Sequence, residues 1–137
     1  MMTDIDRLTS LLADRLAAII PDGFHIEATD GMLRYSCDDS RFPGQLGNYH
    51  VGTAGTYIRV NFESRGLTEV AEQALDELQD YIDEATRDPW PGDRTPPRPH
   101  AQIRDGALHM WYGGADPIAQ AVLACEPIPL SELQRAS

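Results

Sequence analysis

The chain has 137 residues, of which 42% are hydrophobic, and a formal net charge of −11 at pH 7. This size and apolar content predict one folded domain and exclude a chain that is disordered throughout. The acidic excess excludes nucleic acid and anionic membranes as favoured partners, because both need a basic protein surface. The two cysteines are too few for a disulfide scaffold or a structural zinc site.

The N-terminal sequence predicts a cellular location and a first helix. It is acidic and has no apolar segment typical of a signal peptide, and no apolar run in the chain is long enough to span a membrane. We therefore expect a cytoplasmic protein. Residues 3–20 predict a helix, because apolar residues recur on one side at helical spacing, and Pro21 and Gly23 end it.

Residues 24–37 predict a β-hairpin that turns at Asp30 and Gly31. A shift of this register by one residue would mix its apolar and polar sides, so we expect the two-residue turn. That register places six apolar or aromatic side chains on one side: Phe24, Ile26, Ala28, Leu33, Tyr35 and Cys37.

The middle of the chain predicts a loop, a strand, a helix and a connector. Residues 38–55 are rich in glycine and predict a long loop, and residues 56–63 predict a strand. Residues 88–99 hold five prolines and predict an extended connector. Residues 67–87 predict the longest helix, with one apolar stripe formed by Leu67, Val70, Ala71, Ala74, Leu75, Leu78, Ile82 and Ala85.

A second hairpin is predicted over residues 100–111, and a final strand near residues 118–126. The hairpin turns at Asp105 and Gly106. Its register directs four side chains to the core, namely Ala101, Ile103, Leu108 and Met110. The same register gathers His100, Gln102, His109 and Trp111 on the outer side.

The predicted fold is a single α+β domain over residues 1–137. Its order is α-β-β-β-α-β-β-β, with an antiparallel sheet and the two main helices on one face. HIEATDGML at 25–33 and HAQIRDGAL at 100–108 share four residues at equivalent places. This similarity predicts a duplicated αβββ unit, residues 3–63 and 67–126.

The outer side of the second hairpin is one candidate surface for a ligand or partner, formed by His100, Gln102, His109 and Trp111. Large amphipathic side chains such as tryptophan dominate binding surfaces. The alternative is a hairpin whose tryptophan packs under a loop. His100 and His109 lie diagonally across the strands, but the spacing supplies no third metal ligand, so we expect neither a metal nor a cofactor.

The glycine-rich loop supplies three further candidate contacts, Arg41, Tyr49 and His50. The alternative is a loop without a binding role. Its glycines do not predict a phosphate cradle, because no Lys-Ser or Lys-Thr follows them and the loop leads into a strand.

The long helix carries a second candidate surface, the acidic strip of Glu72, Asp76, Asp80 and Glu84 at i,i+4 spacing. Like charges at this spacing destabilise a helix, so the strip is either a solvated face or a docking strip for a partner rich in arginine or lysine. Calcium does not fit, because carboxylates along a helix give poor coordination geometry.

Two resemblances add to this interpretation. The segments DPWPG, PHAQIRDGALHMWYGG and EPIPL resemble a recurrent group of small uncharacterised actinobacterial proteins, and the likeness covers most of the chain. That group implies no activity. In its order of elements the chain also resembles, more loosely, the type III secretion chaperone-like proteins, including the YbjN type. The second resemblance implies a small, acidic and often dimeric protein.

Together these observations predict a non-enzymatic domain that binds a basic protein surface, as a chaperone, an immunity protein or a regulator does. The sequence leaves a homodimer open. The alternative is a small enzyme or ligand-binding domain with its site between residues 38–55 and His100, His109 and Trp111. No catalytic residue is assigned, because no nucleophile motif is present.

Overall fold

The computed structural model describes residues 4–29, 31–37, 53–57, 66–86, 90–91, 97–114, 116 and 120–133, with residues 53–57 described by their backbone. It confirms the α+β class and the predicted order of elements. The helices are α1 (Asp4–Ala17), α3 (Leu67–Thr86) and the short α4 (Leu130–Leu133). The strands are β1 (Phe24–Thr29), β2 (Met32–Cys37), β3 (Thr53–Tyr57), β4 (Pro99–Arg104), β5 (Ala107–Gly113), β6 (Ala121–Ala124) and β7 (Ile128–Pro129).

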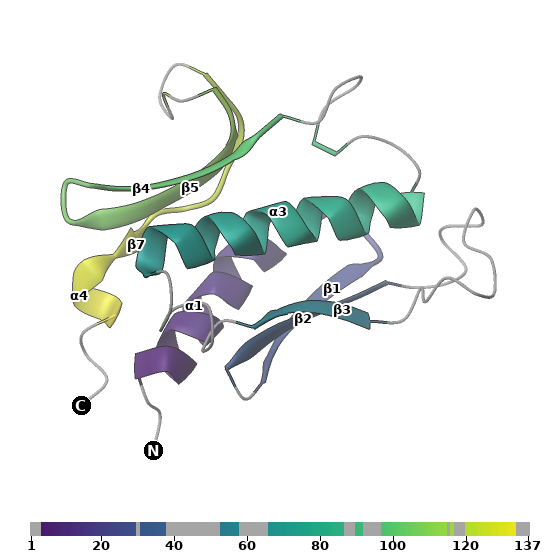
Figure 1. The fold of residues 1–137 in the computed structure, drawn as a ribbon, viewed down its shortest axis with the longest axis horizontal. Helices are drawn as coiled ribbons and strands as arrows, with labels where there is room; N and C mark the ends of the chain where they lie inside the picture. The colour runs from purple at the N-terminus through teal and green to yellow at the C-terminus, as the bar shows by residue number, and fades with distance from the viewer. Residues whose placement is uncertain are drawn as a thin grey trace.

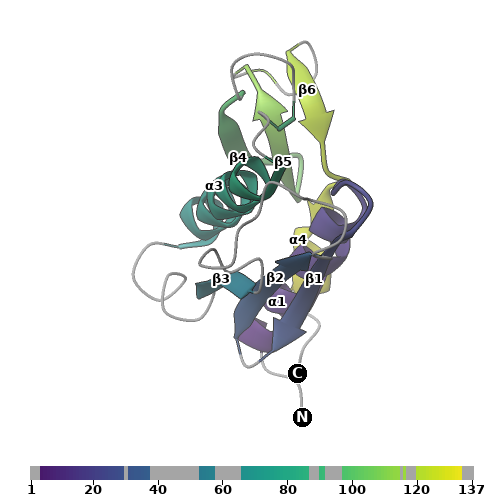
Figure 2. The ribbon, with the colours of Figure 1, turned by 90° about the vertical axis from the view of Figure 1, so that its right-hand side faces the viewer.

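The strands form two antiparallel sheets, where the sequence predicted one. The first has the order β1-β2-β3, and the second has the order β4-β5-β6, with β7 pairing the other end of β5. Helix α3 lies between the two sheets (Figures 1 and 2). Both halves therefore have an α-β-β-β order, but the duplication itself stays a prediction.

Two buried tyrosines attach the sheets to neighbouring positions of α3. The Tyr35 hydroxyl of β2 donates to the Ala74 carbonyl at 3.2 Å, and the Tyr112 hydroxyl of β5 donates to the Leu75 carbonyl at 2.6 Å. Tyr81 of α3 packs on the first sheet, against the ring of Phe24. Because α3 is buried on both sides, it packs between the two sheets and does not lie on one face of a single sheet.

Both predicted hairpin registers are confirmed. In the first hairpin Phe24 pairs with Cys37 and Ala28 pairs with Leu33, and in the second Ala101 pairs with Met110. Asp105 and Gly106 have φ angles of 53° and 75°, as a two-residue type I′ turn requires. The Asp-Gly turn and the alternation of apolar residues therefore determine the register together.

Several boundaries differ from the prediction. Helix α1 ends at Ala17, before the predicted end at residue 20, and the final strand is limited to Ala121–Ala124. Of the predicted strand 56–63, only residues 56–57 lie among those described, as the end of β3. Ile103 was assigned to the core but is 50% exposed. The tip of its hairpin extends past the first turn of α3, so little covers it there (Figure 1).

The described residues of the proline-rich connector are fixed to α3. The Gln79 side-chain amide donates to the carbonyls of Trp90 and Pro97, at 3.0 and 2.7 Å, and the Asp83 carboxylate accepts from the Trp90 N–H at 2.7 Å. The Trp90 ring meets Tyr112 edge to face, with ring centroids 5.1 Å apart. These contacts hold the start of β4 beside α3, and so position the groove described next.

Candidate functional site

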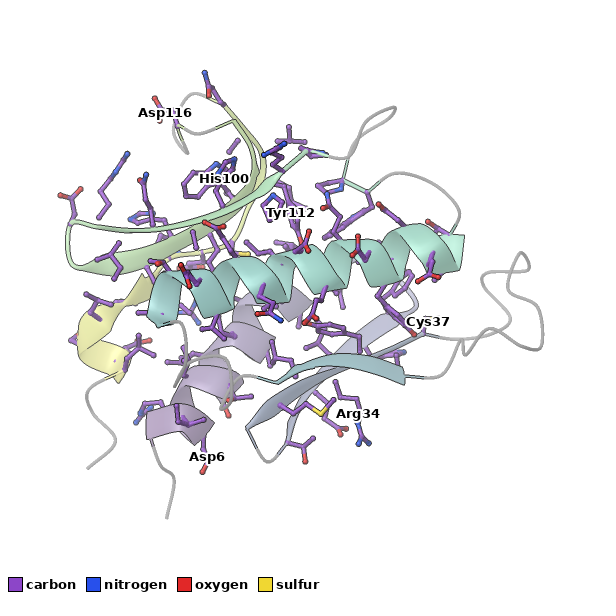
Figure 3. The ribbon with its side chains drawn as sticks, in the orientation of Figure 1. Asp6, Arg34, Cys37, His100, Tyr112 and Asp116 are labelled. Carbon is purple, nitrogen blue, oxygen red and sulfur yellow. The ribbon has the colours of Figure 1, made fainter. Side chains whose placement is uncertain are left out.

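A groove of about 810 Å³ runs between α3 and β4. We call it the acidic groove. From α3 it is lined by Glu69, Glu72, Gln73, Asp76 and Glu77, and from the β4 side by Arg98, Pro99 and His100. Figure 3 shows His100 on the sheet above α3. Four carboxylates thus face one guanidinium across the groove, which makes the groove negative.

The position of these carboxylates follows from the helical repeat. Residues three and four apart share one side of a helix, so Glu69, Glu72 and Asp76 lie together and exposed. The opposite side of α3 buries the apolar stripe, including Ala71 and Leu75, against the sheets. Packing of the stripe therefore directs the acidic residues toward the edge of β4.

One carboxylate of the groove is engaged by the strand beside it. The backbone N–H of Ala101 donates to Glu72 Oε2 at 3.3 Å. Glu77 behaves differently, because its Oε1 is buried and has no hydrogen-bond partner among the described residues. Buried polar atoms are normally hydrogen-bonded, so this oxygen is an unsatisfied acceptor on a side chain that lines the groove.

Negative charge continues along α3 beyond the groove. Asp80 and Glu84, the other two residues of the acidic strip, are exposed farther along the helix. Partial burial raises the pKa of Asp80 above its ordinary 3.8, and the nearby charges of Asp76, Glu84 and Glu77 raise it further. The part of this shift that comes from the three neighbouring carboxylates reflects local negative charge that a cation would relieve.

His100 lines the groove and is held against the second sheet. Its ring stacks on Trp111, with centroids 5.2 Å apart and planes at 22°. Its Nε2 lies 3.0 Å from the Gly113 carbonyl oxygen. A carbonyl only accepts hydrogen bonds, so Nε2 carries the proton and donates.

The expectation of an exposed Trp111 is wrong. Its side chain is on the outer side of the hairpin, as the register predicts, but is 1% exposed. The His100 ring covers it, and its indole N–H donates to the Gly114 carbonyl at 2.7 Å. Trp111 is therefore a packed side chain, held by the His100 ring and the Gly114 carbonyl, and not an exposed contact.

The remaining residues of the outer side do not form a joint site with His100. Gln102 is exposed, and His109 is half-buried with Nε2 3.2 Å from the Arg104 carbonyl oxygen. The two histidines donate to carbonyls at opposite ends of the hairpin. Within the described part of the chain, no group of three or more His, Cys, Asp or Glu side chains is arranged to hold a metal ion.

The groove unites parts of two surfaces predicted separately, Glu72 and Asp76 from the acidic strip and His100 from the hairpin. Sequence reasoning missed Glu69, Glu77 and Arg98. The two glutamates were detectable, because they lie within one helical turn of the strip. The loop candidates Arg41, Tyr49 and His50 fall outside the described residues.

No protein-family model matches the sequence, and no curated protein or solved structure matches the chain. The two resemblances drawn from the sequence therefore stay predictions. Among the helices described, none has the length and apolar character that crossing a membrane requires.

Proposed function

We propose that this protein is a non-enzymatic binding domain whose acidic groove takes arginine or lysine side chains from a partner protein. The observation that carries the proposal is the gathering of Glu69, Glu72, Asp76 and Glu77 along one groove. An arginine or lysine there would meet several carboxylates at once. The net charge of −11 would also attract a basic protein from a distance.

The hydrogen bonds within the groove hold its side chains as a binding wall. Glu72 accepts from the backbone N–H of Ala101, and His100 donates through Nε2 to the Gly113 carbonyl. These contacts position both side chains beside the other carboxylates of the groove. A chaperone, an immunity protein or a regulator would use such a wall to hold a basic segment.

The test compares peptide binding to the wild type and to the double variant Glu72→Gln, Asp76→Asn, which keeps side-chain size and removes two charges. The probe is a fluorescent arginine-rich peptide, measured by anisotropy at low and moderate salt. Exposed ion pairs contribute roughly 0.2–1 kcal/mol each, so we expect affinity to fall between about twofold and thirtyfold. Added salt should weaken wild-type binding.

The matched control is the double variant Glu27→Gln, Glu126→Gln, which removes two exposed carboxylates outside the groove. It changes the net charge by the same amount and should leave affinity nearly unchanged. Equal losses in both double variants would show a general charge effect and refute the groove as the binding site. Equal binding of an acidic peptide would refute the proposed function altogether.

A further inference from the structure

The edge of β4 that borders the acidic groove is an open strand edge. Among the residues that the structure describes, β4 has β5 on one side and no strand on the other. The Gly113 N–H donates to the Arg98 carbonyl at 2.9 Å, so Arg98 is a hydrogen-bonded partner of β5. In an antiparallel pair, successive residues alternately bond to the partner strand and point their backbone groups away from it. The backbone groups of Pro99, Ala101 and Ile103 therefore point away from β5.

The structure already shows one of these outward groups in use. The Ala101 N–H reaches out of the sheet to Glu72 Oε2. Proline and inward-reaching charged groups commonly protect an exposed strand edge from pairing with another chain. Here Pro99 lacks an N–H and a carboxylate caps Ala101. The cap is a side chain on an exposed helix face, so a competing strand can displace it without disturbing the core.

We propose that the partner segment binds as an added β-strand along the open edge of β4, with arginine or lysine at every second position. This inference rests on the proposed function. Alternate side chains of the added strand would point down onto α3, beside which β4 runs (Figure 1). Side chains two apart on a strand are separated by about 6.7 Å, and acidic residues four apart on a helix by about 6 Å. The two repeats match at Glu72 and Asp76, which are four residues apart.

Displacement of Glu72 is part of this binding mode. A backbone carbonyl of the added strand accepts the hydrogen bond from the Ala101 N–H. The released Glu72 carboxylate then pairs with an arginine or lysine of the same strand. The exposed Ile103 lies two residues farther along the edge, where its N–H and carbonyl are also directed outward. Recognition by main-chain hydrogen bonds together with alternate side chains is the general mode of β-strand addition.

The experiment uses three peptides of equal charge and the full-length protein. In the first peptide arginine and threonine alternate; in the second the same residues are grouped into an arginine block and a threonine block; the third is the alternating peptide with N-methylated backbone amides. We expect the alternating peptide to bind tightest. Each blocked main-chain hydrogen bond should weaken binding by about twofold to tenfold. Hydrogen exchange at the Ala101 and Ile103 amides should slow when the alternating peptide is bound.

A variant tests the same edge from the protein side. Ile103→Pro removes an outward N–H and leaves the hydrogen bonds between β4 and β5 in place, because proline is tolerated on strand edges. Ile103→Thr is its control, since it changes the side chain and keeps the N–H. We expect the proline variant alone to lose affinity for the alternating peptide. If it does not fold, the N-methylated peptide decides the question.

Equal binding of all three peptides would overturn strand addition and leave the proposed function standing, because charge alone would then explain the affinity. Binding by none of them would contradict both. Unchanged exchange of the Ala101 and Ile103 amides in a saturated complex would also overturn strand addition.

Discussion

Replacement of Trp111 by alanine tests whether this side chain is structural. The ring is 1% exposed, stacks on His100, and donates one hydrogen bond to the Gly114 carbonyl at 2.7 Å. Truncation of a buried tryptophan costs about 3–5 kcal/mol, and loss of a hydrogen bond accounts for roughly 0.5–1.5 kcal/mol of that cost. Trp111 lies on the outer side of its hairpin, where neighbouring groups can partly collapse, so we expect a cost of about 3 kcal/mol.

Urea unfolding followed by far-ultraviolet circular dichroism measures the loss. Trp111→Phe is the intermediate case, because phenylalanine keeps the stacked ring and cannot donate, and we expect it to cost about 1–2 kcal/mol. The slope of the free energy of unfolding against urea should stay the same in all three proteins. A cost below about 0.5 kcal/mol for Trp111→Ala would refute the reasoning. Weaker peptide binding by that variant would then make Trp111 a surface contact.

Three further substitutions test features that surround the groove. Asp80→Asn should add roughly 0.4–1 kcal/mol to the free energy of unfolding at neutral pH and low salt, because it relieves two like-charge i,i+4 pairs. The raised pKa of Asp80 means that its ionisation disfavours the folded state, so this gain should grow as pH rises above 3.8 and vanish well below it; an equal gain at all pH values would contradict the charge explanation. Gln79→Leu should cost about 1–3 kcal/mol in urea unfolding, since two carbonyls of the connector lose their donor, and a neutral result would remove Gln79 as the clamp. Gly113→Ala should cost at least about 2 kcal/mol, because φ is 145° and an added Cβ would overlap the backbone from Gln120 onward. Gly106→Asn is its control, with open space around it and an expected cost below about 1 kcal/mol; equal costs would argue against the overlap.

The sequence predicted local structure well where two independent signals coincided. Asp105 and Gly106 specify the turn, and the apolar alternation on either side specifies the register, so the second hairpin followed from its own residues. The face on which Trp111 lies was predictable for the same reason. Its burial was not, because burial depends on contacts that the pairing of two strands does not specify.

The sequence of α3 contains a signal of the two-sheet arrangement. The predicted stripe of α3 explains packing on one side, but the structure also buries Gln79 and Tyr81. Tyr81 contacts the first sheet, while Gln79 holds the connector that leads to the second. A tyrosine and a glutamine beside the apolar stripe of α3 indicate that this helix packs against neighbours on more than one side.

The groove could be predicted only in part. The acidic strip followed from the spacing of Glu72 and Asp76, but its neighbour β4 lies more than twenty residues away in sequence. Which strand edge faces the strip depends on the long-range packing of α3 against the second sheet. No local pattern contains that information, and so the strip and the hairpin were predicted as separate surfaces.

The attachment of both sheets to α3 has a consequence for cooperativity. Tyr35 and Tyr112 reach adjacent carbonyls of the same helix from opposite sides, and both are 0% exposed. The buried residues of α1, α3 and both sheets form one continuous hydrophobic cluster. A chain cut between β3 and α3 would separate the two sides of this cluster, so we expect the described elements to fold as one unit. The two sheets are therefore expected to unfold in one transition, whatever the origin of their similar order.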